Sequence, residues 1–200
     1  MSKLPEIVGL TGSMGAGKSA AGSILRKSYP VLDCDQLNRE LLEPGQAGFE
    51  ALLKAGLLPV KDGQADRQAL ADAMFSDPAV RRQVEAILHP LILQAMEDWK
   101  KEQSGLAFVE VPLLFEAGLQ DRFDEVWCVI ADQPVALERL EQGRGVDHTE
   151  ALRRWKNQLD PQTKAAASHY VIENDGSLAE LEAQLKKGVE RIESERSLPD

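Results

Sequence analysis

Continuous apolar runs, each too short for a helix, recur toward both ends of the chain. Runs of this length between turn residues predict β-strands, and a run without polar alternation predicts a strand buried on both faces of a sheet. Helical patterns separate the runs, and this alternation indicates an α/β fold with a parallel sheet. The predicted strands cover residues 6–10, 31–32, 106–111, 125–130 and 169–172.

The stretch between residues 36 and 103 follows a different pattern. Its apolar residues recur at helical spacing, turn residues such as Asp62-Gly63 interrupt them, and no run predicts a strand. We therefore expect a helical insertion between the second and third strands. Two more helical segments are predicted, a charged one over residues 134–158 and an amphipathic one that ends near residue 195.

Composition and charge narrow the range of functions. The chain has 200 residues, of which 43% are hydrophobic and 28% charged, as is typical of one globular unit with its own core. Its 23 Lys and Arg against 33 Asp and Glu give a net charge of −10, which argues against binding nucleic acid or an anionic membrane through bulk charge. A pocket for a small anion is still compatible with this charge, because a local nest of backbone N–H groups binds phosphate.

Targeting signals and cysteine usage bear on where the protein works. The first residues do not combine a basic region, a long apolar stretch and a small-residue cleavage site, so we expect no secretory signal. No segment approaches the ~20 apolar residues of a membrane span. Cys34 and Cys128 lie far apart without metal-ligand spacing, and we expect both to be reduced thiols. These features predict a cytoplasmic protein.

A glycine-rich segment follows the first predicted strand and opens a predicted helix at residues 18–26. It fits G-x-x-x-x-G-K-[ST], the phosphate-binding loop, in the strand–loop–helix context that this motif requires, so a chance glycine-rich turn is the weaker interpretation. Glycines allow successive N–H groups to line one concave surface, and the helix N-terminus adds partial positive charge. We expect Lys18 to reach the β- and γ-phosphates of ATP and the Ser19 hydroxyl to ligate Mg²⁺. The residues expected to bind ATP are Gly12, Ser13, Met14, Gly15, Ala16, Gly17, Lys18 and Ser19.

Other motifs help to decide which phosphate chemistry follows. The Asp-x-x-Gly switch and the Asn/Thr-Lys-x-Asp base reader of GTPases are both missing from the sequence. A motor or transporter ATPase needs a longer chain and a clear acidic residue that ends a β-run and holds Mg²⁺. A small kinase, with an acceptor domain inserted between strands, fits better.

Two aspartates end the second predicted strand, at the sheet edge where open α/β sheets bind ligands. In an extended segment residues two apart point the same way, so we expect Asp33 and Asp35 to face the γ-phosphate site and Cys34 to point away. Asp33 is suited to orient a substrate hydroxyl and accept its proton late in the transfer, and Asp35 to help place Mg²⁺ or the acceptor. The alternative is a pair of solvated turn aspartates.

The combination of these motifs resembles the dephospho-CoA kinase family over nearly the whole chain. A phosphate loop alone is common, but the order of the Asp-x-Asp, His-Pro and Pro-Leu-Leu-Phe-Glu motifs is far more specific. The matching residues run from Gly9 to Ser19, then include Asp33, Asp35, Asp66, Arg67, Leu70, Leu88, His89, Pro90, Val111 to Leu119, Asp124, Val126, Gln158, Lys164, Val171 to Asn174, Gly176 and Ser177.

The resemblance implies an enzyme that uses ATP to phosphorylate the ribose 3′-hydroxyl of dephospho-coenzyme A, giving coenzyme A and ADP in the last step of coenzyme A biosynthesis. It implies a core of residues 1–35, 104–133 and 168–200, an acceptor-binding insertion of residues 36–103 and a lid of residues 134–167. By the same resemblance the catalytic residues are Asp33, Lys18 and Arg139, the acceptor contacts are Asp35, His89, Pro112, Leu113 and Leu114, and Asn174 and Gly176 lie near the adenine of ATP.

The sequence departs from the family pattern in the lid, where Gly143 stands in place of a second arginine and Arg144 comes one position late. Other functional assignments have structural alternatives. His89 before Pro90 also predicts a bend between two helices, residues 112–114 also suit a core, and residues 174–177 also suit a turn with a helix cap at Ser177. A nucleoside or nucleotide kinase and a non-catalytic nucleotide-binding module are the competing functions.

Overall fold

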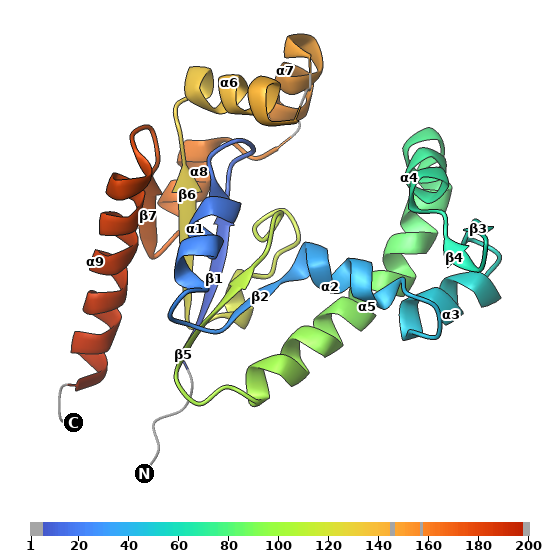
Figure 1. Ribbon diagram of the computed structural model, residues 1–200, viewed down its shortest axis with the longest axis horizontal. Coiled ribbons are helices and arrows are strands. Elements are labelled where there is room, and N and C mark those ends of the chain that lie inside the picture. Colours follow the sequence, from blue (N-terminus) through green and yellow to red (C-terminus); the bar gives the residue numbers. More distant parts are fainter. Residues whose placement is uncertain (1–5, 145–146, 157, 198–200) are drawn as a thin grey trace. The chain divides into compact units, whose positions relative to one another are not determined.

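A computed structural model describes residues 6–144, 147–156 and 158–197 of the chain. The chain forms two compact units (Figure 1). We call Met1–Val31 with Gln103–Asp200 the sheet unit, and Leu32–Glu102 the helical unit.

The five-stranded sheet has the strand order β2-β5-β1-β6-β7 (Figure 1). β1 pairs in parallel with β5 on one side and β6 on the other, and β6 pairs in parallel with β7. The predicted parallel α/β fold is confirmed. The strands are β1 (Glu6–Gly12), β2 (Val31–Asp33), β5 (Leu106–Glu110), β6 (Glu125–Ile130) and β7 (Tyr170–Glu173).

Helices α1 (Lys18–Leu25) and α9 (Leu178–Ser197) share one hydrophobic core with the sheet. Phe108 and Trp127 are fully buried in this core, and their rings meet edge to face with centroids 5.3 Å apart. Along β1, Val8 and Leu10 belong to the same cluster, as the alternation of side chains along a strand requires. The core thus fixes β1 and α1, the two elements that flank the phosphate loop.

Other segments of the sheet unit cover the opposite side of β1. A Cβ atom added to Gly9 would lie 2.8 Å from the Leu114 and Phe123 side chains, so the chain that follows β5 packs directly on this strand. The described residues of this unit also form α6 (Gln133–Arg144), α7 (His148–Lys156), α8 (Pro161–Ala166) and a 3₁₀ turn at Gln120–Arg122.

The helical unit has a core of its own, in which Phe49, Leu52, Leu70 and Val84 are buried. It forms because α2, α3 and α4 each pack an apolar stripe on the long α5. Its helices are α2 (Cys34–Leu41), α3 (Ala47–Lys54), α4 (Arg67–Ser76) and α5 (Pro78–Lys101).

Two expectations for the helical unit are wrong. The segment predicted to contain no strand forms a hairpin of β3 (Val60–Lys61) and β4 (Gln64–Ala65), because Asp62 and Gly63 both adopt the positive φ angles that a tight hairpin turn requires. The division into two helices predicted at His89-Pro90 is also wrong, because α5 is one helix that continues through Pro90. A proline removes one helical hydrogen bond, and buried residues on both sides, such as Leu88 and Met96, keep the helix packed.

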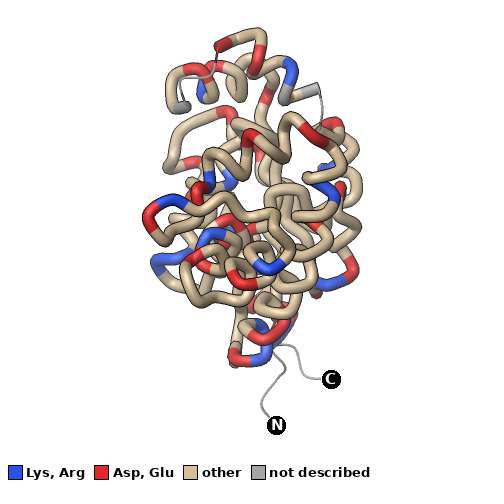
Figure 2. Tube along the Cα trace, turned by 90° about the vertical axis from the view of Figure 1, so that its right-hand side faces the viewer, with Lys and Arg blue, Asp and Glu red and all other residues tan. Residues whose placement is uncertain are grey.

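Charged residues of both signs are scattered along the trace (Figure 2). Of the helices that can be described, each is too short or too polar to cross a bilayer.

Candidate functional site

The phosphate loop joins β1 to α1 within the sheet unit. Gly17, the N-cap of α1, has a left-handed backbone with φ of 95°, and no described side chain caps this helix. The first N–H groups of a helix have no partner within the helix, so they are left for an anion. Gly15 has φ of 75°, and a Cβ atom there would overlap the Ala136 carbonyl. Both glycines are therefore required by backbone angle and by space.

Three hydrogen bonds hold the back of this loop. The Ser13 N–H donates to the Val129 carbonyl at 3.1 Å, which ties the loop to the end of β6. Asn174 is buried, and its side-chain amide donates to the Ala16 carbonyl at 2.7 Å. Arg139 in turn donates to the Asn174 carbonyl at 2.7 Å. The structure therefore brings two predicted site residues, Asn174 and Arg139, to the phosphate loop.

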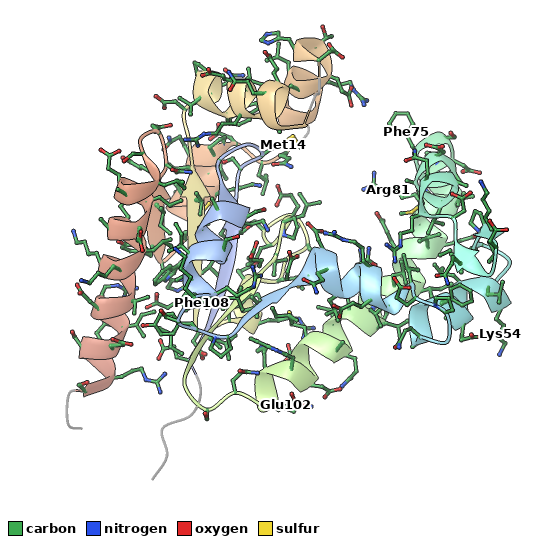
Figure 3. The ribbon with its side chains drawn as sticks, in the orientation of Figure 1. Met14, Lys54, Phe75, Arg81, Glu102 and Phe108 are labelled. Carbon is green, nitrogen blue, oxygen red and sulfur yellow. The ribbon has the colours of Figure 1, made fainter. Side chains whose placement is uncertain are left out.

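Met14 connects the loop to the segment predicted as a lid (Figure 3). Its side chain packs against a small cluster built from Leu137, Leu140 and Ala151 of α6 and α7. Its N–H donates to the side-chain carbonyl of Gln158 at 3.2 Å. The first turn of the loop is thus held from outside by residues of the 134–167 segment. Arg144, which comes one position after the place of the family's second arginine, has a side chain that lies outside the described residues.

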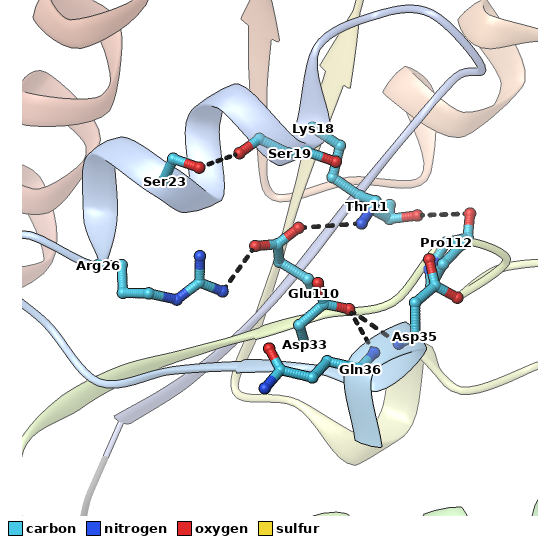
Figure 4. Close-up of polar contacts among 10 residues, drawn as sticks. All are labelled: Thr11, Lys18, Ser19, Ser23, Arg26, Asp33, Asp35, Gln36, Glu110 and Pro112. Carbon is cyan, nitrogen blue, oxygen red and sulfur yellow. Dashed lines mark hydrogen bonds and ion pairs between the residues drawn. The ribbon is translucent and has the colours of Figure 1, made fainter. Parts of the chain in front are cut away.

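Glu110, which ends β5, is the main residue of this site that the sequence analysis does not single out. Its carboxylate is 2% exposed and forms ion pairs with Lys18 Nζ at 3.1 Å and Arg26 at 3.2 Å (Figure 4). Gly22 of α1 leaves room for it, because a Cβ atom there would overlap the Glu110 carboxylate. A local signal is present, since an acidic residue ends an apolar β-run, the feature that the sequence analysis expects only of a larger ATPase.

Ser19 lies in the first turn of α1, and its residue is exposed. Its carbonyl accepts a hydrogen bond from the Ser23 hydroxyl at 2.8 Å (Figure 4). Lys18 and Ser19 are consecutive, so the helix start presents an ammonium and a hydroxyl beside the uncapped N–H groups. This donor set fits a nucleotide triphosphate with a bound Mg²⁺ ion.

Asp33 ends β2 and is the N-cap of α2. Its Oδ1 accepts hydrogen bonds from the Asp35 N–H at 2.8 Å and the Gln36 N–H at 3.2 Å (Figure 4). The extended conformation expected for residues 33–35 is wrong, because Cys34 already begins the helix and Asp35 lies in its first turn. Aspartate is among the best N-cap residues, so helix formation overrides the strand pattern here.

The predicted acceptor contacts occupy different environments. Leu113 is 43% exposed, whereas Leu114 is fully buried and packs near Gly9. Pro112 is partly exposed, and its carbonyl lies 3.5 Å from the Thr11 hydroxyl. His89 is exposed on α5 in the helical unit. The contacts of Leu114 support a packing role, and acceptor binding by these four residues stays a prediction.

The turn before α9 has the geometry of a capping box. The Ser177 N–H donates to the Glu180 carboxylate at 2.6 Å, and the Glu180 N–H donates to the Ser177 hydroxyl at 3.3 Å. The predicted helix cap at Ser177 is confirmed. Gly176 lies in this turn, and its contact with adenine stays a prediction.

Comparisons with known proteins address the function directly. The family model described as "Dephospho-CoA kinase" matches residues 6–180. A dephospho-CoA kinase from Frankia casuarinae is 39% identical over 185 residues, which cover 90% of this chain and 80% of that protein. One from Geobacter sulfurreducens is 36% identical over 190 residues, which cover 91% of this chain and 96% of that protein. A crystal structure of a Thermus thermophilus protein superposes with a TM-score of 0.80 at 35% identity, covering 95% of this chain and 99% of the other.

Proposed function

The chain belongs to the dephospho-CoA kinase family, and we propose on that basis that it transfers the γ-phosphoryl group of ATP to the ribose 3′-hydroxyl of dephospho-coenzyme A. The structural observation that supports ATP as the donor is the phosphate loop, in which a left-handed glycine leads into an uncapped helix start with Lys18 as its first residue. This arrangement supplies fixed N–H dipoles and a cation for the phosphates of ATP.

The donor set supports Mg²⁺ as the metal that accompanies ATP. Ser19 would supply a hydroxyl ligand, and the Glu110 carboxylate would receive one or more of the metal-bound waters. When bound, Mg²⁺ neutralises charge on the β- and γ-phosphates. Lys18 contributes the same kind of stabilisation from the protein, because its ammonium is fixed on α1 beside Glu110.

Asp33 is proposed to orient the acceptor hydroxyl and to accept its proton as the transfer completes. Its place at the end of β2 and its fixed cap geometry support this role, because a positioned carboxylate contributes through orientation. Arg139 is proposed to stabilise charge on the transferring group, and its contact with the Asn174 carbonyl keeps it beside the phosphate loop.

The division of labour along the chain is part of the same proposal. The helical unit would bind the acceptor, the 134–167 segment would close over the nucleotide, and closure would exclude water as a competing nucleophile. The acceptor is a small molecule rather than a nucleic acid. We place the reaction in the cytoplasm, where thiols such as Cys34 and Cys128, neither of which is in a disulfide, stay reduced.

Product analysis tests the proposal. The protein would be incubated with Mg-ATP and dephospho-coenzyme A, and in parallel with adenosine, with nucleoside monophosphates and without acceptor, and the products identified by mass spectrometry. We expect only dephospho-coenzyme A to gain one phosphoryl group, with a product that co-elutes with coenzyme A. Transfer to a nucleotide instead would contradict the assignment of the acceptor, and a lack of transfer to any acceptor would leave a nucleotide-binding module.

A further inference from the structure

A buried lysine outside the phosphate loop has no role in the proposed reaction. Lys164 of α8 is completely buried, and its ammonium pairs with Glu116 Oε1 at 2.7 Å. Burial of an ammonium is costly, and a buried ion pair often contributes less to stability than apolar residues of the same volume would. A pair of this kind therefore calls for an explanation beyond stability.

Glu116 Oε1 also accepts a hydrogen bond from the Leu159 N–H at 3.2 Å. Leu159 lies where the chain leaves α7 and approaches α8, and Glu116 lies in the segment that follows β5. The carboxylate thus holds the backbone at residue 159, and Lys164 holds the carboxylate. Glu116 is 21% exposed at its side chain, so the buried cation restricts the positions that it can adopt.

The residue before Leu159 reaches the phosphate loop. The side-chain carbonyl of Gln158 accepts a hydrogen bond from the Met14 N–H at 3.2 Å and so supports the loop. The next residue along the chain, Leu159, is the one that Glu116 holds. All five residues belong to the sheet unit. A displacement of the backbone at Leu159 would move Gln158 away from the Met14 N–H.

We infer that Glu116 and Lys164 are a positioning pair for nucleotide binding, which holds the backbone at Leu159 so that Gln158 supports the phosphate loop at Met14. The inference builds on the proposed function, because it assigns the phosphate loop to ATP. Glu116 and Lys164 act through Gln158 and do not themselves touch the nucleotide. The role is distinct from that of Glu110, which pairs with Lys18 directly.

Two double variants separate positioning from stability. Glu116→Gln with Lys164→Met removes both charges but keeps a side-chain oxygen that accepts from the Leu159 N–H. Glu116→Met with Lys164→Met removes both charges and that oxygen as well. Because neither variant leaves a buried unpaired charge, we expect both to fold.

We expect Glu116→Met/Lys164→Met to bind Mg-ATP about 3- to 10-fold more weakly than Glu116→Gln/Lys164→Met, the effect of one neutral hydrogen bond. Affinity would be measured by calorimetry, and thermal unfolding would be recorded for each variant. Equal affinities for the two double variants would overturn the inference. A difference in Mg-ATP affinity that a difference in the fraction of folded protein fully explains would also overturn the inference.

Gln158→Leu tests the path of the effect. Alone it should weaken Mg-ATP binding by a similar factor, and added to Glu116→Met/Lys164→Met it should have little further effect, because the two changes break one chain of contacts. Full additivity, or tighter binding by Gln158→Leu, would overturn the path. Glu125→Gln with Arg191→Met is the matched control. This ion pair belongs to the same unit and lies at the first residue of β6, whereas the phosphate loop is bonded to Val129 near the other end of that strand.

The affinity measurement does not depend on the acceptor. If the wild-type protein binds Mg-ATP and the two double variants differ, but dephospho-coenzyme A is not phosphorylated, the proposed function fails and the positioning pair stands. If dephospho-coenzyme A is phosphorylated and the two double variants bind Mg-ATP equally, the proposed function stands and the positioning pair fails.

Discussion

Asp33 and Glu110 are both carboxylates at the last position of a strand, yet their environments are opposite. Asp33 is partly exposed, and its Oδ1 accepts two N–H groups from the next turn of chain. Glu110 is 2% exposed and pairs with two cations that α1 supplies. The first carboxylate is held by a local cap that leaves its negative charge without a paired cation among the described contacts, and the second is neutralised by Lys18 and Arg26. A strand end can thus leave a carboxylate without a paired cation among the described residues, as at Asp33, where we propose a role in the reaction, or bury one between two cations, as at Glu110.

The largest effect is expected from Asp33→Asn. Asparagine caps helices as well as aspartate does, so the variant should unfold at nearly the wild-type temperature. Loss of the carboxylate should lower turnover by about 10²–10⁴ with little change in Mg-ATP affinity, which is the usual contribution of a general acid or base. Steady-state kinetics and calorimetry would measure both quantities.

Asp77→Asn is the matched control, because Asp77 is also an N-cap, that of α5, and accepts the Ala79 N–H. This variant should retain the wild-type turnover. Turnover of Asp33→Asn within a few fold of wild type would remove Asp33 from the role of base, and the contrast between the two carboxylates would then be structural only.

Glu110→Gln is expected to have the next largest effect. It leaves Lys18 and Arg26 without their shared counter-charge, and hydrogen bonds to charged groups contribute about 1.5–3 kcal/mol. We therefore expect turnover to fall by about 10- to 100-fold and, in contrast to Asp33→Asn, the unfolding temperature to fall as well. Glu125→Gln serves as the control, because Glu125 is an ion-paired carboxylate at the start of β6. If Glu110→Gln only lowers stability, as this control should, Glu110 has no part in ordering Lys18.

The same contrast explains how far the sequence predicts the site. The phosphate loop and the five strands have local signals, and the structure confirms them. Asp33 is also recognisable locally, although its strand pattern hides the helix that begins at Cys34. The pairing of Glu110 is different, because its partners Lys18 and Arg26 lie 92 and 84 residues away in the sequence. A parallel sheet brings such residues together only through its strand order, which local patterns do not determine.

The helical unit shows the opposite failure, in which a local signal is present but conflicts with its surroundings. The Asp62-Gly63 pair forms a hairpin turn inside a segment of helical periodicity. Pro90 lies inside α5, where local sterics favour a break. There the packing of Val84, Leu88 and Met96 outweighs the lost hydrogen bond. The predicted acceptor contact at His89 depended on the same dipeptide, and it stays a prediction.

Gly22→Ala tests the space around Glu110, and we expect it to have a smaller effect than the substitutions above, on the free energy of unfolding. In an exposed helix the change from glycine to alanine stabilises by about 0.5–1 kcal/mol. At Gly22 the new methyl group would overlap the Glu110 carboxylate, so we expect the free energy of unfolding to fall by about 1–3 kcal/mol, the usual effect of overpacking. Gly143→Ala is the control, because nothing described lies within 4 Å of a Cβ atom at this position of α6. Opposite signs for the two variants in urea denaturation support the close packing of Glu110, and a stabilising Gly22→Ala would contradict it.

The smallest expected effect is on the pH dependence of stability, and it compares two thiols, Cys34 beside Asp33 and Cys128 in the middle of β6. Cys34 is partly exposed, whereas Cys128 is completely buried, and burial raises the pKa of the Cys128 thiol from 9.0 to about 11. The unfolded chain therefore ionises this thiol at lower pH than the folded protein does. The stabilisation that comes from burying the neutral thiol is complete below about pH 9 and is lost as the pH rises toward 11. By pH 10 the loss is about 1 kcal/mol. Urea denaturation between pH 8 and 10.5 should show a steeper loss of stability for the wild type than for Cys128→Ala, and Cys34→Ala should follow the wild-type slope. Parallel slopes for wild type and Cys128→Ala would mean that the interior of the sheet admits water at β6, and the buried Cys128 would then not differ in this respect from the partly exposed Cys34 of α2.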